Sequence, residues 1–586
     1  MKTITQILTE LVSEAFEQCG YDKKLGAVSV SDRLDLCQFQ CNGSFDGAKQ
    51  YKKPPFVIAE EVVKALDQNT IFKVVEVVRP GFINLTLTDD YILKIATDIA
   101  KDANLGIPQV ETPETIVLDY GGPNVAKPLH IGHLRSAIIG EALKRIAKAT
   151  GRKVISDVHL GDWGLQIGLV IAELEERNPT WKCFASSFEP KTDIVATLDI
   201  DALNELYPFA SQKSKEDETF KEKARHITFE LQNGREGYIA LWKEIMRVSV
   251  YDLKETYKKL NVDFDLWYGE SDAEKYVEQL LSTLSDKGLL YKSEGAMVVD
   301  VSEETDKAAL PPIIIKKSDN SNIYATTDLA TIIQRQNDFA PDKLWYVVDK
   351  RQGLHFTQVF RCAKKAELVP EKTQLDHLGF GTMNGSDGKP YKTRDGGVMR
   401  LSDLLSTIID AAFDKISTSN LISEAEKKDT ARKIGIAAIK FGDLINHRSK
   451  DYIFDIDKFL SFEGKTGTYL LYTVTRINSI LKKVNYNEAA AISFSDIYTD
   501  VERELLLSII LSGEAFKHAI EEKAPNFICD NAYKLAAQFS GFYHDNHITN
   551  ESDETKKSTW IALCLLTRKM LLKHLDVLGI DAVERM

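Results

Sequence analysis

Cysteine is scarce in this chain, with seven scattered among 586 residues. Their odd number and irregular spacing do not match the disulfide framework of a secreted protein and favour reduced thiols in the cytoplasm. Only Cys37 and Cys41 lie close together, and without a second pair they do not form the usual zinc pattern. We therefore expect a cytoplasmic protein that holds no zinc.

Long hydrophobic runs are missing as well. No apolar stretch reaches the ~18 residues that a membrane-spanning helix requires. Residues 1–8 indicate the start of an amphipathic helix and not a secretory signal, because no long apolar core follows them. We expect no membrane partner.

Positive charge is in deficit. Lys and Arg total 74 against 87 Asp and Glu, which gives a net charge of −13 at pH 7. This excludes a uniformly basic nucleic-acid binder but leaves room for local basic patches, such as residues 49–53. A chain of this length that is 44% hydrophobic can form several domains, each with its own core.

The first part of the chain, residues 1–110, is predicted to be a separate α+β domain. Helical patterns at 3–18 and 57–67 precede strand-like runs at 71–78 and 82–87, and a Pro-Gly turn signal separates the two runs. Helices and adjacent strands in this order are typical of an α+β unit.

Residues 111–400 change to a repeat of strand, loop and helix. Strand-like runs separated by helical patterns lie at 115–120, 153–158, 344–348 and 375–380. The alternation predicts an α/β domain with a parallel, doubly wound sheet. A charged, mostly helical stretch at about 170–320 interrupts the alternation and is expected to be an insertion.

Residues 401–586 carry apolar positions at helical spacing, which predicts an all-α bundle. The polar run at 551–557 is expected to be a loop within it.

The most informative segment is 123–133, which places His130, Gly132 and His133 between a strand-like run and a helical run. Ligands of open α/β sheets bind where strands end, and a helix N-terminus there favours anions. Imidazoles at that place can donate to phosphate oxygens, and a glycine lets a flat base approach. A metal site is the alternative, but the glutamate of H-E-x-x-H is missing.

With its neighbours, this segment resembles the H-I-G-H signature of class I aminoacyl-tRNA synthetases, and the chain resembles the arginyl-tRNA synthetase family along nearly its whole length. Further matching segments, in the family's order, are 161–168, 324–330, 461–467 and 575–586. The resemblance implies a class I Rossmann-like catalytic domain. It also implies ligation of L-arginine to tRNA(Arg) in two steps, with ATP and Mg²⁺ and without a resident metal.

The resemblance assigns phosphate chemistry to His130 and His133 as donors, with Gly132 making room for adenine. The family's second signature, a K-M-S-K loop, is degenerate here, and Tyr391-Lys392-Thr393-Arg394 stands in its place. In the family, Lys127 is thought to supply a compensating charge. Glycines around Lys389, Lys392 and Arg394 would let the loop close over pyrophosphate. The alternative is that this segment is a surface turn with ordinary basic residues.

Arginine specificity requires carboxylates and polar groups around a planar guanidinium that is always charged. Asp328 and Tyr324 lie four residues apart on a predicted helix and match the family's guanidinium-binding positions. The remaining positions that match arginine-binding residues are Asp119, Gly122, Asn124, His133 and Gln352. The alternatives are a helix-face ion pair for Asp328 and a core aromatic for Tyr324.

The resemblance also implies two contacts with tRNA. Phe82 and Asn84 match the aromatic and amide residues that read the tRNA elbow in the family, where such a pair suits an unpaired nucleotide, and Asn42 lies nearby in the sequence pattern and is expected to join them. Tyr469, Tyr472 and Arg476 share a helical face in the domain expected to bind the anticodon. Burial of Phe82 in the strand core, and of the tyrosines in the bundle, are the alternatives.

Competing functions fit less well. Gly464-Lys465-Thr466 resembles the end of a P-loop, but Phe459 stands where the first glycine is required. Another class I synthetase, a small nucleotidylyltransferase and a catalytically silent relative remain as alternatives. The helical residues 401–586 argue against the second, and the intact histidines argue against the third. We expect a monomer.

Overall fold

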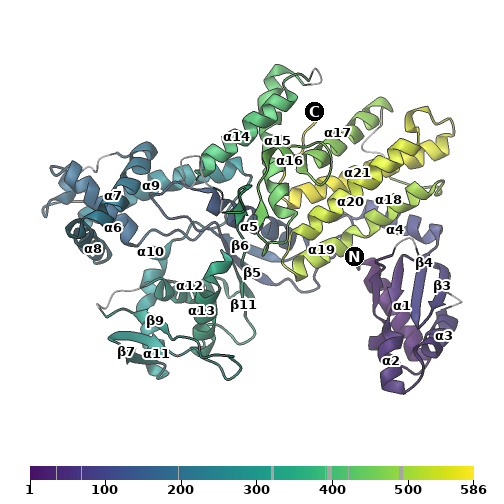
Figure 1. The fold of residues 1–586 in the computed structure, drawn as a ribbon, viewed down its shortest axis with the longest axis horizontal. Helices are drawn as coiled ribbons and strands as arrows, with labels where there is room; N and C mark the ends of the chain where they lie inside the picture. The colour runs from purple at the N-terminus through teal and green to yellow at the C-terminus, as the bar shows by residue number, and fades with distance from the viewer. Residues whose placement is uncertain are drawn as a thin grey trace.

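The structure is a computed structural model in which several structural units follow one another along the chain (Figure 1). It describes residues 1–33, 36–66, 69–193, 195, 197–318, 323–389, 391, 399–419, 422–486 and 492–586. Among these described residues, we found no helix that is both long and apolar enough to cross a membrane.

The N-terminal unit combines an antiparallel sheet with helices, as predicted. Its elements are α1 (Ile4–Gln18), β1 (Val28–Val30), β2 (Phe39–Cys41), α2 (Gly43–Tyr51), α3 (Pro55–Leu66), β3 (Phe72–Val78), β4 (Phe82–Leu87) and α4 (Asp89–Lys101). The strand order is β1-β2-β4-β3. Ile83, Leu85 and Leu87 of β4 are fully buried, so alternate residues of this strand face the core.

The central sheet confirms the parallel α/β prediction. Its strands lie in the order β11 (Gln374–His377), β10 (Lys343–Val347), β5 (Thr115–Tyr120) and β6 (Lys153–Asp157), and every pairing is parallel. The helices packed against it are α5 (Ile131–Ala149), α12 (Tyr324–Phe339) and α13 (Gly353–Lys365).

This sheet is covered on both faces, which makes it doubly wound. Ile116 and Leu118 of β5 pack into the hydrophobic cluster that contains α5. Val117 packs into a second cluster with apolar residues of α12 and α13. Burial on both faces explains why β5 is continuously apolar and does not alternate.

The insertion between β6 and α12 is mostly helical, as predicted, but also contains a small sheet. Its helices are α6 (Leu165–Arg177), α7 (Ile200–Glu216), α8 (Glu218–Gln232), α9 (Glu236–Lys259), α10 (Glu270–Ala273) and α11 (Val277–Asp286). The strands β7 (Leu290–Ser293), β8 (Ala296–Val299) and β9 (Ile313–Lys316) form an antiparallel sheet. Four-residue strands carry too little periodicity to be predicted from sequence.

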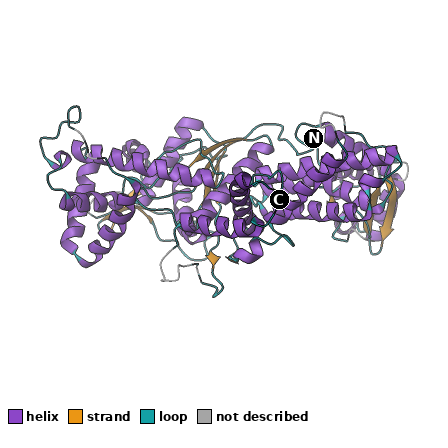
Figure 2. Ribbon diagram, turned by 90° about the horizontal axis from the view of Figure 1, so that it is seen from above, coloured by secondary structure: helices purple, strands orange, loops and turns teal. Residues whose placement is uncertain are grey.

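The C-terminal region is a helical bundle, seen at the upper right of Figure 1. Its helices are α14 (Leu401–Ile416), α15 (Glu424–Leu444), α16 (Ile456–Phe459), α17 (Gly467–Lys483), α18 (Asp500–Ile510), α19 (Ser512–Glu521), α20 (Asn526–Asp545) and α21 (Glu554–Val577). A short parallel pairing of β12 (Met383–Asn384) with β13 (Tyr452–Ile453) joins this region to the segment after β11. Helices account for most of the molecule, whereas strands are confined to a few places (Figure 2).

The loop predicted at 551–557 is too long. Helix α21 already begins at Glu554, and Asp553 caps it by accepting from the backbone N–H groups of Thr555 and Lys556. Aspartate is favoured at a helix N-cap for this reason, so part of the polar run is a helix start.

A buried ion pair joins the catalytic sheet to the bundle. Arg135 of α5 lies 2.8 Å from Asp443 of α15, and both side chains are at most 2% exposed. Removal of one partner leaves an uncompensated buried charge. We predict that Asp443→Ala lowers the free energy of unfolding by about 3–5 kcal/mol, measured by urea denaturation.

The matched control is the exposed Lys94–Asp98 pair, in which the side chains are 67% and 46% exposed. Asp98→Ala should cost less than about 1 kcal/mol, because solvent screens that pair. Equal losses in the two variants would contradict the role given to the Arg135–Asp443 pair.

Candidate active site

The predicted site lies where the chain connections of the central sheet diverge. From β5 the chain runs through α5 to β6, whereas from β10 it runs through α13 to the opposite edge, so β5 and β10 flank the topological switch point. Ser136 of α5 holds their carboxyl ends together: its hydroxyl donates to the Val347 carbonyl at 2.7 Å and accepts from the Gly121 N–H at 2.8 Å. Ligands of such sheets bind in this crevice.

His130 and His133 form the N-terminus of α5, with ring centroids 4.0 Å apart. Nδ1 of His130 accepts from the Gly132 N–H at 3.0 Å, and Nδ1 of His133 accepts from the His130 N–H at 3.1 Å. An accepting Nδ1 assigns the proton of a neutral ring to Nε2. Each ring therefore keeps an Nε2–H with which it can donate to a ligand.

Both histidines are uncharged at neutral pH. Burial, aided by the charge of Lys127, lowers the pKa of His130 to about 4. Burial, followed by the neighbouring His130 and by Lys127, lowers the pKa of His133 to about 3. The pair supplies hydrogen-bond donors at a helix N-terminus and contributes no imidazolium charge.

Gly132 is required by this arrangement. A Cβ at this position would come within 2.8 Å of the His130 ring, at Cε1 and Nδ1. The residue is exposed, so the space that its missing side chain leaves is open to a ligand.

The loop before the histidines is shaped by two consecutive glycines. Gly121 and Gly122 have φ of 91° and 42°, a left-handed conformation that residues with a Cβ adopt only at a cost. Asn124 pairs with Gly161 in a parallel bridge, and a Cβ on Gly161 would lie 2.2 Å from the Asn124 amide oxygen. The predicted residues Gly122 and Asn124 thus lie directly beyond the end of β5.

Asp119 is buried in a charged cluster. One nitrogen of Arg335, Nη2, lies 2.6 Å from Asp119 and 2.7 Å from Asp157. Burial alone would lower the pKa of His159, but its interaction with Asp157 and the charge of Asp119 raise it to about 9. Two carboxylates thus face two cationic side chains, which explains how four charged groups can be buried together.

This cluster also holds the one group of potential metal ligands found among the described residues. Ligand atoms of Asp119, Asp157 and His159 lie within 4.8 Å of one another. The guanidinium of Arg335 already bridges both carboxylates. These residues therefore do not fit a resident metal ion.

The predicted guanidinium-binding residues occupy the first turns of α12. Tyr324 is 66% exposed, so the alternative that it is a core aromatic is wrong. The Asp328 carboxylate lies 2.6 Å from Nε2 of His355 in α13, a contact that joins it to the next helix. Gln352 is exposed and caps α13 after β10. All three lie on segments that adjoin the crevice.

Glu270 is a residue that the sequence analysis missed. Burial raises the pKa of this carboxyl to about 7; His159 opposes the shift, and the charges of Asp162 and Asp328 reinforce it. Tyr324 also lies within its electrostatic reach. Glu270 thus lies within electrostatic reach of both Asp328 and Tyr324, and we call this group of three side chains the acidic pocket. It stands on a four-residue helix, where no periodic pattern marks it.

The loop predicted to close over pyrophosphate ends beside the histidines. Lys389 is exposed, whereas Lys392 and Arg394 lie outside the described residues. After the loop, the Met399 carbonyl accepts from the Ile131 N–H at 3.1 Å, and the Leu401 N–H donates to the Leu129 carbonyl at 2.9 Å. The chain thus returns from this loop directly onto the segment that carries His130.

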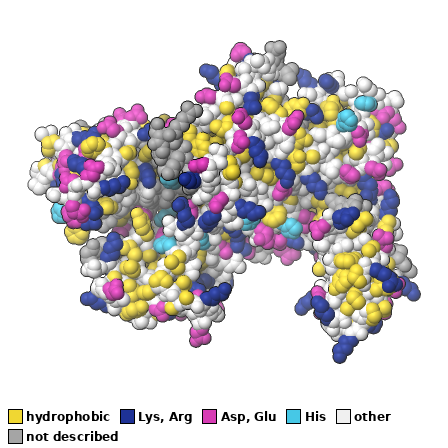
Figure 3. Space-filling view, in the orientation of Figure 1, with side chains coloured by type: hydrophobic (Ala, Val, Ile, Leu, Met, Phe, Trp, Pro, Cys, Tyr) yellow, Lys and Arg dark blue, Asp and Glu magenta, His cyan; other side chains and the backbone are white. Residues whose placement is uncertain are grey.

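In the N-terminal unit, Phe82 and Asn84 lie on the face of β4 opposite its core residues. Phe82 is half-buried against Phe45, with ring centroids 4.9 Å apart, so the alternative that it lies in the strand core is wrong. The Asn84 amide oxygen accepts from Gln40 at 2.9 Å, and Asn42 is exposed just before α2. Figure 3 shows Lys and Arg side chains at the border of this unit.

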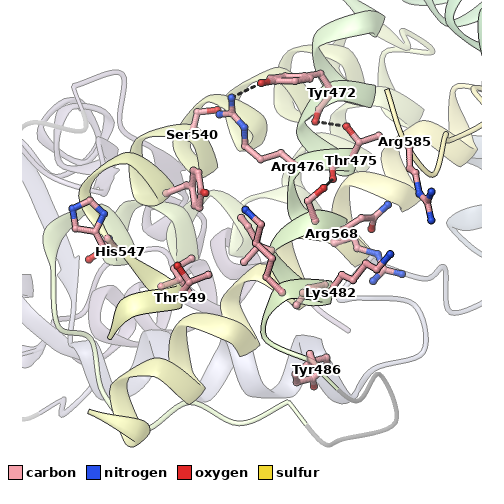
Figure 4. A pocket seen from close by; sticks show the side chains of 18 of the residues that line it. Tyr472, Thr475, Arg476, Lys482, Tyr486, Ser540, His547, Thr549, Arg568 and Arg585 are labelled. Carbon is pink, nitrogen blue, oxygen red and sulfur yellow. Dashed lines mark hydrogen bonds between the residues drawn. The ribbon is translucent and has the colours of Figure 1, made fainter. Parts of the chain in front are cut away.

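The C-terminal bundle contains a large polar cavity of about 1790 Å³ (Figure 4). Tyr472 and Arg476 line it and hydrogen-bond to each other at 2.7 Å. Tyr469 instead packs between helices, where its hydroxyl lies 3.0 Å from that of Ser540. The cavity's basic side chains are Arg476, Lys482, Lys483, Arg568 and Arg585. Among the described residues that line it, Glu584 is the one acidic residue, so this is a local basic patch on an acidic protein.

Three family models match successive parts of the chain. Residues 2–87 match the arginyl-tRNA synthetase N-terminal domain, and residues 95–456 match the catalytic domain of class I tRNA synthetases (R). Residues 470–586 match the DALR anticodon-binding domain.

Similar full-length proteins agree with these matches. The chain is 49% identical over 587 residues to an arginine–tRNA ligase of Alkaliphilus oremlandii and 49% identical over 597 residues to one of Agathobacter rectalis. A third relative, from Francisella tularensis subsp. holarctica, is 43% identical over 589 residues. Each alignment covers 100% of both chains.

Solved structures share the fold. The arginyl-tRNA synthetase of Plasmodium falciparum superposes with a TM-score of 0.80 at 23% identity, and that of Thermus thermophilus with 0.79 at 22%. Both superpositions cover 100% of each chain. With histidine donors at the switch point and relatives that match from end to end, the chain belongs to the arginyl-tRNA synthetase family of class I aminoacyl-tRNA synthetases.

Proposed function

We propose that the protein ligates L-arginine to tRNA(Arg) with ATP, through an arginyl-adenylate. A carboxylate oxygen of arginine attacks the α-phosphorus of ATP, and pyrophosphate leaves. A ribose hydroxyl at the tRNA 3′ end then attacks the carbonyl carbon of the adenylate, and AMP leaves. The observation that carries this proposal is the pair of neutral histidines on the α5 N-terminus, each with its Nε2–H left for a ligand.

The first step concentrates negative charge on the α-phosphate and on pyrophosphate, so it requires fixed donors and cations more than a base. His130 and His133 donate through Nε2–H, and Gly132 leaves room for adenine. Lys127 and Lys389, together with Lys392 and Arg394, supply positive charge. ATP enters as its Mg²⁺ complex, so the ion belongs to the substrate.

The acidic pocket receives the guanidinium of arginine. Asp328 and Glu270 offer carboxylates and Tyr324 a hydroxyl, which suits the five donors of a planar guanidinium. The other proposed arginine-binding residues are Gly122, Asn124, His133 and Gln352. Asp119 contributes through Arg335, because that pair is buried.

The two ends of the chain hold the tRNA. Asn42, Phe82 and Asn84 contact the elbow, and Tyr472 and Arg476 contact the anticodon loop in the basic cavity, with Tyr469 supporting them from the bundle. Aromatic rings and arginines are the usual stacking surface for unpaired bases. We propose the same division of the chain as above, at about residues 110 and 400, and a cytoplasmic monomer.

Arginine-dependent exchange of pyrophosphate into ATP, with tRNA present, tests the first step. We expect exchange with arginine and none with lysine, ornithine or citrulline, since none of these presents a guanidinium. Exchange with lysine equal to that with arginine would reject the acidic pocket as the specificity site. Omitting tRNA from the same assay shows whether activation depends on it.

Glu270 predicts a pH dependence of arginine binding. Its pKa is raised to about 7, so the carboxylate that attracts a guanidinium forms as the pH rises through 7. The guanidinium itself does not titrate there. The KM for arginine should therefore fall by about tenfold between pH 6 and pH 8 as the ionised fraction grows.

The matched variant is Glu270→Gln, which keeps the shape but cannot ionise. It should raise the KM for arginine and remove its pH dependence while the KM for ATP stays constant. An unchanged slope in Glu270→Gln would show that another group titrates.

A further inference from the structure

The backbone just before Lys127 is held in an unfavourable conformation. Ala126 has φ of 62°, in the left-handed region that a residue with a Cβ rarely adopts. Such a conformation persists only where the surroundings enforce it. On one side, the Val125 N–H donates to the Gly161 carbonyl at 2.9 Å. The direction in which Lys127 leaves the loop depends on how Ala126 is held.

The second restraint comes from the helical insertion. The Ala126 N–H donates to the hydroxyl of Ser249 at 3.1 Å, and the two residues are 2% and 4% exposed. Ser249 lies in the middle of α9, so a rigid helix determines where this hydroxyl stands. A buried N–H without this acceptor would be unsatisfied.

The same insertion also contacts Lys127 itself. The ammonium of Lys127 lies 5.8 Å from the ring centre of Tyr207 in α7, within the range of a cation–π interaction. Tyr207 is half-buried and is also within electrostatic reach of Tyr324. Its ring therefore contacts the ammonium of Lys127 and lies within electrostatic reach of Tyr324.

Two further contacts fix the insertion to the opposite loop of the site. Trp242 of α9 donates from its indole N–H to the Asp162 carbonyl at 3.0 Å. Gln232 of α8 donates to the Trp163 carbonyl at 2.8 Å. Because the insertion is fastened to both loops, Ser249 and Tyr207 approach the 123–133 segment from a fixed frame.

We infer that Ser249 and Tyr207 are positioning residues for Lys127. Ser249 holds Ala126 in its left-handed conformation, and the Tyr207 ring retains the ammonium near the phosphates. The inference rests on the proposed function, in which Lys127 replaces charge that the degenerate loop lacks. It assigns to the insertion a part in activating the amino acid.

Single-turnover formation of the adenylate, with tRNA present, tests the inference. Ser249→Ala should slow this step by about fivefold, the effect of one hydrogen bond. Tyr207→Leu should slow it by about three- to tenfold, whereas Tyr207→Phe keeps the ring and should retain the wild-type rate. The KM for arginine should change little in either slow variant.

Two double variants distinguish a positioning role of these residues from a role in packing alone. In a Lys127→Gln background, Tyr207→Leu should add less than about a twofold loss, because its partner is already gone. In a Ser249→Ala background, Ala126→Gly should restore the rate to near that of Ala126→Gly alone, since glycine adopts the left-handed conformation freely.

The inference is overturned if Tyr207→Leu slows the reaction equally with and without Lys127, or if Ala126→Gly fails to rescue Ser249→Ala. Those results would show that both contacts contribute only to packing, and they would leave the proposed function intact. A Lys127→Gln variant with the wild-type rate would remove the role of Lys127 and this inference with it. A wild-type protein that does not activate arginine would overturn the proposed function itself.

Discussion

His133→Ala should slow formation of arginyl-adenylate by about 10²- to 10³-fold, the usual cost of losing one preorganised donor to a developing oxyanion. The ring of His133 keeps its Nε2–H for the substrate because Nδ1 is occupied by the His130 N–H at 3.1 Å. Its loss removes a donor and also releases the cap of α5. The affinity for tRNA should stay within about twofold, because the elbow and anticodon contacts that we propose lie on other domains.

His133→Asn is the matched variant, since its amide can both accept from the His130 N–H and donate to a phosphate oxygen. It should recover part of the lost rate. If His133→Ala lowered the tRNA affinity as much as the activation rate, the residue would serve folding and not the transition state.

The pH profile gives an independent check of the same site. Burial holds the pKa values of His130 and His133 at about 4 and about 3, so both rings stay neutral from pH 6 to pH 8. Adenylate formation at saturating arginine should therefore show no histidine titration in that range. A rate that fell as the pH rose through 6.5 would indicate an imidazolium acting as a charge.

Asp328→Ala should raise the KM for arginine by about 10- to 200-fold, corresponding to the roughly 1.5–3 kcal/mol of a hydrogen bond to a charged group. In the free protein its carboxylate faces His355 at 2.6 Å, a neutral or cationic partner that an incoming guanidinium can displace. The KM for ATP should change by less than about twofold, since the phosphate site that we propose lies at the α5 N-terminus.

Asp328→Asn and His355→Ala separate specificity from structure. The asparagine keeps an acceptor but loses the charge, so its KM for arginine should lie between those of wild type and Asp328→Ala. His355→Ala removes the helix-to-helix contact and should leave arginine specificity intact. Loss of thermal stability in Asp328→Ala with an unchanged KM would leave Asp328 as an ion-pair residue only.

Much of the site follows from local sequence. A strand that is apolar on both faces, two glycines and a histidine pair at a helix start are neighbours along the chain, so pattern and spacing are sufficient to predict them. The parallel sheet follows from the alternation of strands and helices, and its strand order places β5 beside β10.

The rest depends on contacts between distant segments. Arg335 reaches across 216 residues to Asp119, and no pattern in one sequence predicts that pairing. Glu270 stands on a short helix without periodicity, and its raised pKa comes from burial by other segments. Phe82 could not be assigned to a face of β4 until the register placed Ile83 and Leu85 in the core.

In the C-terminal bundle, too, the sequence alone does not predict which side chains face the cavity. Helical spacing places Tyr469, Tyr472 and Arg476 on one side of α17, but the packing of α20 decides which of them faces the cavity. Residues at helical spacing share one face of a helix, but their spacing does not show which element packs against that face.

The central claim is tested most directly by charging total tRNA with each of the twenty amino acids in turn, in the presence of ATP and Mg²⁺, and measuring the aminoacyl-tRNA formed. The account predicts that arginine alone is attached, that the product is tRNA(Arg), and that His133→Ala forms it far more slowly. Attachment of another amino acid, or no attachment of arginine, would contradict it.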